Sequence, residues 1–210
     1  SSAPGQTRLS AANPLPEHYM PATIQTLLEA PPGFRSESVA RFLWQMDEQR
    51  RALIADTRDL TPEALGWQPA PGMNSIGMLL AHIAYAENHL TQVGLEGKAT
   101  SDTKAVIGIG EQEEGLPLAP GAPPPPALAG HDLAWFDGML ERARTYTRRV
   151  AMTLAENDLA REVRRQRPDG SARVFNVGWV LYHMLEHEAG HHGQINLLRH
   201  LQRLAGSPTA

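Results

Sequence analysis

The sequence predicts an all-α protein built as a four-helix bundle. Three observations point to this fold: four segments of about twenty residues or more repeat apolar side chains near the helical period, prolines and glycines separate these segments, and each segment has one apolar stripe to bury. Of the 210 residues, 41% are hydrophobic, which is enough for the core of one domain. We therefore expect a folded domain over residues 36–205, with a proline-rich arm at 1–35 and a short tail at 206–210.

The first two helices are predicted at residues 37–57 and from Asn74 or Ser75 to about Val93. Ser36 and Ser75 can each cap the free amides of a first helical turn. The two stripes consist of Val39, Phe42, Leu43, Met46, Leu53 and Ile54, and then of Ile76, Leu79, Leu80, Ile83 and Leu90. After the second helix, residues 98–130 contain the run GLPLAPGAPPPPALAG, which cannot be a helix interior and predicts a long proline-rich connection to the third helix.

The third helix is predicted from Asp132 to about Glu156, and the fourth from Val177 to about Leu204 with Asn176 as its cap. Between them the sequence RPDGS indicates a turn, because proline restricts one backbone angle and glycine accepts a positive one. A small hairpin is therefore expected before the fourth helix.

Composition excludes several classes of function. The formal net charge is -4 and no run of five or more lysines and arginines occurs, so nucleic-acid binding has little support. No apolar segment approaches the roughly 20 residues that span a bilayer, and the first residues lack the apolar centre of a signal peptide, so we expect a soluble, cytoplasmic protein without membrane contact. Cysteine is absent, so a metal ion would have to be held by histidine, carboxylate or water.

Histidines concentrate in the fourth helix, where LYHMLEHEAGHHGQINLLRH carries five of the nine in the chain. At about 100° per residue, His187 and His191 both lie close to the apolar stripe, whereas His183 lies on its flank. Two buried imidazoles one turn apart are costly without a partner, and a divalent cation would satisfy both. The best third ligand is His82, which stands in the middle of the otherwise apolar second helix. Glu87 is expected to be solvated or to lie beside the metal ligands.

The segment HEAGH, residues 187–191, also matches the pattern in which two histidines bind zinc and the intervening glutamate, Glu188, is the general base of a peptidase. Such enzymes take a third ligand downstream. No aspartate or glutamate follows Glu188 in this chain, so a peptidase is the weaker hypothesis.

The segments NSIGMLLAHIA and HEAGHHGQI, about 105 residues apart, resemble the two motifs of the DinB-like (YfiT-like) family of metal-dependent four-helix proteins. This resemblance implies a four-helix bundle of that type, with His82, His187 and His191 as metal ligands, and it implies a homodimer. GWVLYHMLEHEAGHHG is also similar to the branch that includes mycothiol-dependent isomerases, although that branch often has glutamate at the place of His187. His192 stands where relatives often have arginine.

Three neutral imidazoles leave the charge of a metal uncompensated and coordination positions open, which is typical of catalytic sites. Zinc and nickel are the ions expected first. Our first hypothesis is a transferase or isomerase that activates a low-molecular-weight thiol cosubstrate for attack on a small-molecule substrate. A hydrolase with Glu188 as base and a non-catalytic, stress-related metal-binding protein are the two alternatives.

Overall fold

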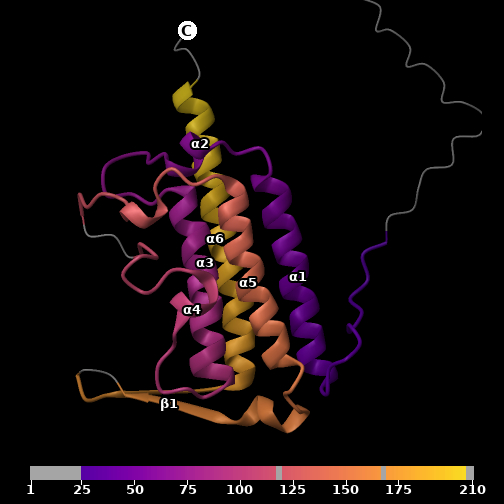
Figure 1. The fold of residues 1–210 in the computed structure, drawn as a ribbon. Coiled ribbons are helices and arrows are strands. Elements are labelled where there is room, and N and C mark those ends of the chain that lie inside the picture. The colour runs from indigo at the N-terminus through magenta and orange to yellow at the C-terminus, as the bar shows by residue number, and fades with distance from the viewer. Residues whose placement is uncertain (1–24, 117–119, 167–168, 207–210) are drawn as a thin grey trace, which may run out of the picture.

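Four long helices pack side by side in the computed structural model, which describes residues 25–116, 120–166 and 169–206 (Figure 1). These helices are α1 (Glu37–Thr57), α3 (Ile76–Leu90), α5 (Leu133–Ala151) and α6 (Val177–Gly206). Helix α1 packs on α5 and α6, and α3 packs on the same two helices, which closes a four-membered ring. The all-α bundle predicted from the sequence is confirmed. Most of the predicted arm and tail, residues 1–24 and 207–210, lies outside the described residues.

The long connection between α3 and α5 allows these two neighbours to run in the same direction. Figure 1 shows α3 descending, the chain returning to the upper end of the bundle, and α5 descending again, whereas α1 and α6 ascend. A short α4 (Thr103–Ile107) and a 3-10 turn η2 (Pro126–Leu128) lie in the connection. Parallel neighbours in a bundle require such a crossover, because a short loop joins antiparallel helices.

Local signals account for the helix ends. The side chains of Ser36, Ser75 and Asp132 each accept a hydrogen bond from a backbone N–H in the first turn of the helix that follows. Asn176 caps α6 in the same way, its Oδ1 accepting from Trp179 N at 2.8 Å. The predicted starts of the four long helices are therefore correct to within one or two residues.

Two predicted helix ends differ from the structure. Helix α3 changes at Thr91 into a π-helical turn, η1 (Thr91–Leu95), whose Thr91 hydroxyl bonds to Glu87 O and to the Thr147 hydroxyl. Helix α5 ends at Ala151 rather than near Glu156, because Leu154 turns into the core and a 3-10 turn, η3 (Glu156–Ala160), follows. A short helix α2 (Pro62–Gly66), capped by Thr61, was not expected in the segment between the first two long helices.

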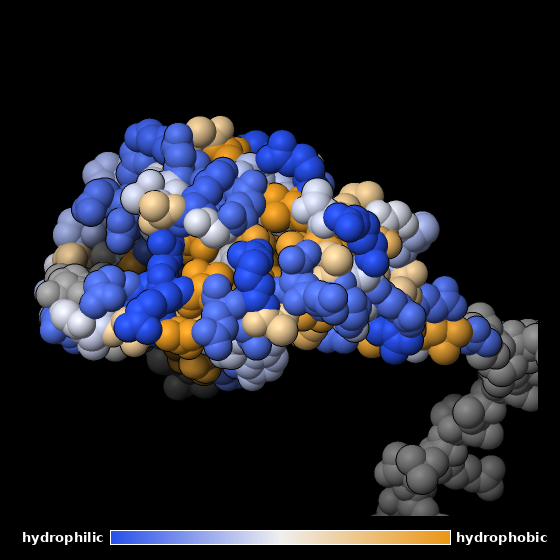
Figure 2. Space-filling model, turned by 90° about the horizontal axis from the view of Figure 1, so that it is seen from below, coloured by the Kyte–Doolittle hydropathy of each residue, from blue (hydrophilic) through white to orange (hydrophobic). Residues whose placement is uncertain are grey.

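The predicted hairpin is present at the lower end of the bundle. It consists of β1 (Glu162–Gln166) and β2 (Ala172–Asn176), paired antiparallel with Val163 opposite Phe175. Seen from this end, hydrophilic side chains separate the hydrophobic ones that reach the surface (Figure 2). Among the described residues, no helix combines the length and apolar character needed to cross a bilayer.

The core consists of two hydrophobic clusters, one above the other. The upper cluster includes Leu53, Ile76, Leu80, Ile83, Phe136, Leu140, Ile195 and Leu198. The lower cluster includes Val39, Leu43, Met46, Val150, Val177, Val180, Leu181 and Met184. On each long helix one charged residue separates the two clusters, and these four residues are Arg50, Glu87, Arg144 and Glu188.

The four charged residues, which we call the buried charge layer, bond to one another. Arg50 donates to Glu188 at 2.6 Å and to Glu87 at 2.8 Å. Arg144 donates to Glu87 at 2.8 Å and to Glu188 at 2.9 Å. Two cations and two anions make the layer neutral, and its charge-assisted bonds satisfy groups that could not otherwise be buried. Glu87 was expected to be solvated or beside the metal ligands; this prediction is wrong, because two guanidinium groups neutralise it inside the bundle.

Candidate metal centre

Three histidines meet between α3 and α6 above the buried charge layer. The Nε2 atom of His187 lies 3.1 Å from Nε2 of His82 and 3.2 Å from Nε2 of His191. One ligand atom from each of the three side chains lies within 4.8 Å of the others, and all three residues are partly buried. The structure thus brings together the three residues that were predicted as ligands from segments about 105 residues apart.

Helical geometry explains why these side chains meet. His187 and His191 are one turn apart on α6 and therefore project from the same side of that helix. Helix α3 packs directly on this side, and His82 stands near its middle. The ring centroids of His82 lie 4.9 Å from those of both His187 and His191.

Hydrogen bonds orient two of the three rings. Nδ1 of His82 lies 2.5 Å from Oε2 of Glu114, and Nδ1 of His191 lies 2.8 Å from Oε1 of Gln194. Since carboxylate and amide oxygens accept, each Nδ1 carries the proton and each Nε2 presents a lone pair. A metal-binding histidine is commonly held in this way, by an acceptor on its other nitrogen.

Glu114 comes from the proline-rich connection and was not predicted from the sequence. It is buried, and Gly115 after it adopts a φ of 87°, a left-handed conformation that favours glycine and allows the chain to turn away. The stretch EQEEG offers three acidic residues within four positions, and nothing local distinguishes the one that turns inward.

The spacing and donor set fit a first-row divalent cation. At a metal–nitrogen distance of about 2.0–2.1 Å, two imidazole nitrogens would stand about 2.9 Å apart for a right angle and about 3.4 Å apart for a tetrahedral one. The two shorter separations, 3.1 and 3.2 Å, fall between these limits, and all three ligand atoms lie within 4.8 Å of one another. Among the described residues no fourth protein ligand joins the group, which leaves positions for small molecules.

The surroundings of His187 keep its imidazole neutral, the form that binds metals. Burial, followed by the neighbouring His191 and His82, lowers the pKa of His187 to about 3. Burial also lowers the pKa of His191. Both rings are therefore neutral at physiological pH, the state in which imidazole binds metals.

The other histidines of α6 have different contacts. His183 stacks on Trp179 with ring centroids 4.5 Å apart, and its Nδ1 bonds to Glu186 at 2.8 Å. His192 bonds to Asp56 and Gln49 of α1 at 2.8 and 2.9 Å and so joins the two helices. His183 is outside the group of three, as the helical angle predicted.

Glu188 belongs to the buried charge layer rather than to the open side of the site. Its two oxygens accept from Arg50 and Arg144, and the residue is 2% exposed. Both carboxylate oxygens are engaged by guanidinium groups inside the bundle, so this geometry argues against the general-base role suggested by HEAGH. Arg50 and Arg144 were not singled out in the sequence, although each continues the apolar stripe of its helix four residues after a buried side chain, Met46 and Leu140.

Comparison with known proteins supports the fold and the family. The model of the DinB superfamily matches residues 45–195, a span that contains all three histidines. Among solved structures, the chain is similar to a crystal structure described as the conserved protein of locus from Enterococcus faecalis, with a TM-score of 0.55 and 15% sequence identity, over 76% of this chain and 94% of that chain. At this identity the likeness shows the fold alone. No curated protein matches the sequence.

Proposed function

The chain belongs to the DinB superfamily, and on that premise we propose that it is a metal-dependent transferase or isomerase that acts with a low-molecular-weight thiol. His82, His187 and His191 would hold a divalent cation, with zinc or nickel as the first choices. The observation that carries this proposal is the convergence of three Nε2 atoms with no fourth side chain among the described residues. A structural zinc site is normally closed by four protein ligands, so three ligands favour a catalytic one.

A cation held by neutral imidazoles lowers the pKa of a thiol or water that binds to it, because its positive charge is not compensated by the ligands. The residues around the site would fix the ligand rings. Glu114 holds the ring of His82, and Gln194 holds that of His191. With no cysteine in the chain, a reacting thiol has to come from a small molecule.

A thiol cosubstrate is favoured over hydrolysis by the position of Glu188. Hydrolysis would need a free base near the bound water, and the carboxylate proposed for that role lies in the buried charge layer. The remaining alternative, a non-catalytic, stress-related metal-binding protein, would be supported by a fourth protein side chain on the metal.

Metal analysis and thiol titration test this proposal. Protein purified without a histidine tag should contain about one divalent cation per chain, and its cobalt-substituted form should change its visible spectrum when a small thiol is added. His82→Ala should lose most of the metal. His183→Ala is the matched control, because its imidazole is on α6 but outside the group of three, and it should keep the metal.

Three results would each count against part of the proposal. Full metal content in His82→Ala would disprove the site. An unchanged visible spectrum of the cobalt-substituted protein with every thiol tested would disprove the thiol chemistry. Ester or amide hydrolysis without added thiol would replace it with a hydrolase.

A further inference from the structure

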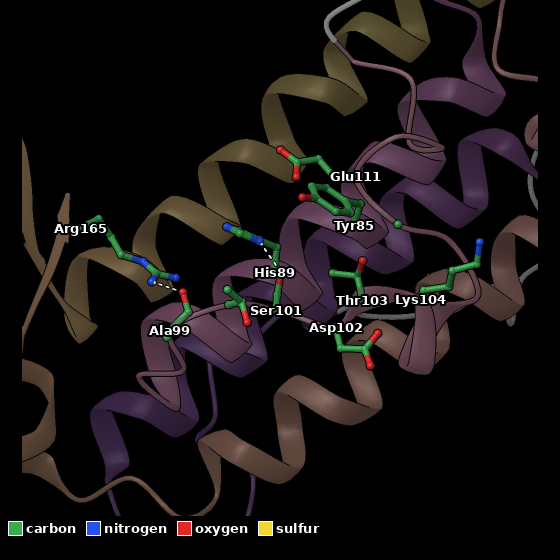
Figure 3. Close-up of a pocket in the computed structure, with 11 residues that line it drawn as sticks. Tyr85, His89, Ala99, Ser101, Asp102, Thr103, Lys104, Glu111 and Arg165 are labelled. Carbon is green, nitrogen blue, oxygen red and sulfur yellow. Dashed lines mark hydrogen bonds between the residues drawn. The ribbon is translucent and has the colours of Figure 1, made fainter. Parts of the chain in front are cut away.

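A pocket of about 410 Å³ lies against the lower half of α3, about one to two helical turns from His82. Helix α3, the proline-rich connection and strand β1 form its walls (Figure 3). The side chains that matter for the argument are Tyr85, His89, Ser101, Lys104, Glu111 and Arg165. Its volume is in the range of pockets that bind small molecules.

The pocket and the metal centre lie along one face of α3. His82 and His89 are seven residues apart, so they project within about 20° of each other and lie about 10 Å apart along the helix. Tyr85 lies between them. The same loop of the connection supplies Glu114 to the histidine group and Glu111 to the pocket. A molecule would therefore have to be about 10 Å long to contact both.

Several polar groups in the pocket have no hydrogen-bond partner within the described part of the chain. Nδ1 of His89 is bonded to the Ser101 hydroxyl at 2.7 Å, but its Nε2 has no hydrogen-bond partner among the described residues. The Tyr85 hydroxyl and the Glu111 carboxylate make no hydrogen bond to the described residues, and Arg165 contacts the carbonyl of Ala99 at 2.8 Å but no carboxylate. By contrast, Lys104 is already paired with Glu113 at 2.8 Å.

Opposite charges stand on two sides of His89. Figure 3 shows Arg165 on one side of the ring and Glu111 with Tyr85 on the other. Both charges act on the ring: burial lowers the pKa of His89, Arg165 lowers it further, and Glu111 opposes them. Burial, then Glu111 and Glu114, raise the pKa of Tyr85 to about 12, so its hydroxyl stays a hydrogen-bond donor at neutral pH.

We propose that this pocket binds the zwitterionic α-amino-acid end of the thiol cosubstrate, with its carboxylate on Arg165 and its ammonium group on Glu111. The identity of the other end as a thiol rests on the proposed function. A single amino acid is too short to bridge the two sites, whereas about three extended residues span 10 Å. The ligand class is thus a short peptide thiol whose first residue is linked through its side-chain carboxyl group, so that its α-ammonium and α-carboxylate groups both stay free. Glutathione is a convenient probe of this class.

Calorimetric titration with S-methylglutathione tests the pocket without relying on activity. Because the capped sulfur cannot become a thiolate, its binding should be the same before and after the metal is removed with a chelator. One molecule should bind per chain with a dissociation constant below about 1 mM. Arg165→Gln and Glu111→Gln should each weaken binding about tenfold, the effect of losing one charge-assisted hydrogen bond. Lys104→Gln is the matched control and should change binding less than about twofold.

The ligand can be varied in the same way. Removing the α-amino group of the probe should weaken binding to the unaltered protein and abolish the effect of Glu111→Gln, because the two changes remove one interaction. The pocket assignment would be overturned by absence of binding, by an affinity that neither substitution changes, or by binding that disappears after chelation. The metal analysis of His82→Ala and the cobalt spectrum are separate measurements, so failure of the pocket and failure of the proposed function are distinguishable.

Discussion

Replacing Glu114 with glutamine should weaken metal binding although Glu114 is not a predicted ligand. The carboxylate accepts the Nδ1 proton of His82 at 2.5 Å, and only 5% of its side chain is exposed. Within this buried contact, the negative charge increases the electron density at Nε2 and holds the ring in the ligating orientation. Glutamine keeps an acceptor oxygen at the same position but removes the charge.

The expected magnitude follows from the contact. Loss of a partner that orients a metal-binding histidine costs about 10- to 100-fold in affinity, or about 1.4–2.8 kcal/mol at 1.4 kcal/mol per factor of ten. Glu114→Gln should lie near the lower limit, because the hydrogen bond can persist. Glu114→Ala should lie near the upper limit, since it also releases the ring of His82.

Competition for zinc with a chromophoric chelator measures these affinities. Glu113→Gln is the matched control: its carboxylate stands on the same turn but bonds to Lys104 and to Gly110 N. This control should bind zinc within about twofold of the unaltered protein. Equal affinity of Glu114→Gln and the unaltered protein, or equal losses in the two variants, would refute the reasoning.

Three further predictions concern the bundle itself. Arg144→Met should lower the free energy of unfolding by about 3–5 kcal/mol, because it leaves buried carboxylates short of a partner. Gly94→Ala should lower it by about 1–3 kcal/mol, since a Cβ there would lie 2.9 Å from both γ-carbons of Val180. Burial would raise the pKa of Glu87, but Arg144 and Arg50 outweigh it and hold that pKa below its usual 4.5. The stability that this shift contributes is present above pH 4.5 and is lost as the pH falls through the lower value. Glu87→Gln should therefore flatten the acid side of the plot of unfolding free energy against pH.

Urea unfolding of the chelated protein, repeated from about pH 3 to 6 for Glu87→Gln, measures all three effects. Arg41→Gln is the control for Arg144, because its ion pair with Glu37 is exposed, and its effect should stay below about 1 kcal/mol. Gly193→Ala is the control for Gly94, since an added Cβ meets nothing within 4 Å, and it should stabilise α6 by about 0.5–1 kcal/mol. A neutral Arg144→Met, a Gly94→Ala no worse than its control, or parallel pH profiles would contradict the respective prediction.

The sequence alone determined the four long helices, the hairpin and the inward orientation of two candidate ligands. Caps at Ser36, Ser75, Asp132 and Asn176, together with apolar periodicity, located the four helices, because these signals act within one or two turns of the chain. The same periodicity placed His187 and His191 on the inner side of α6 and His183 on its flank. These are properties of one helix at a time.

The tertiary structure decided what lies opposite those residues. His82 was chosen in the sequence as a histidine in an apolar segment and by resemblance, and its meeting with His187 depends on how α3 packs on α6. Glu114 looks like its acidic neighbours until the connection folds over α3. Glu87 and Glu188 look like solvated or catalytic carboxylates until Arg50 and Arg144 face them. Local patterns specify which way a side chain points on its own helix. The charged groups that face this side chain, their distance from it and its exposure to solvent depend on other segments, which only packing brings together.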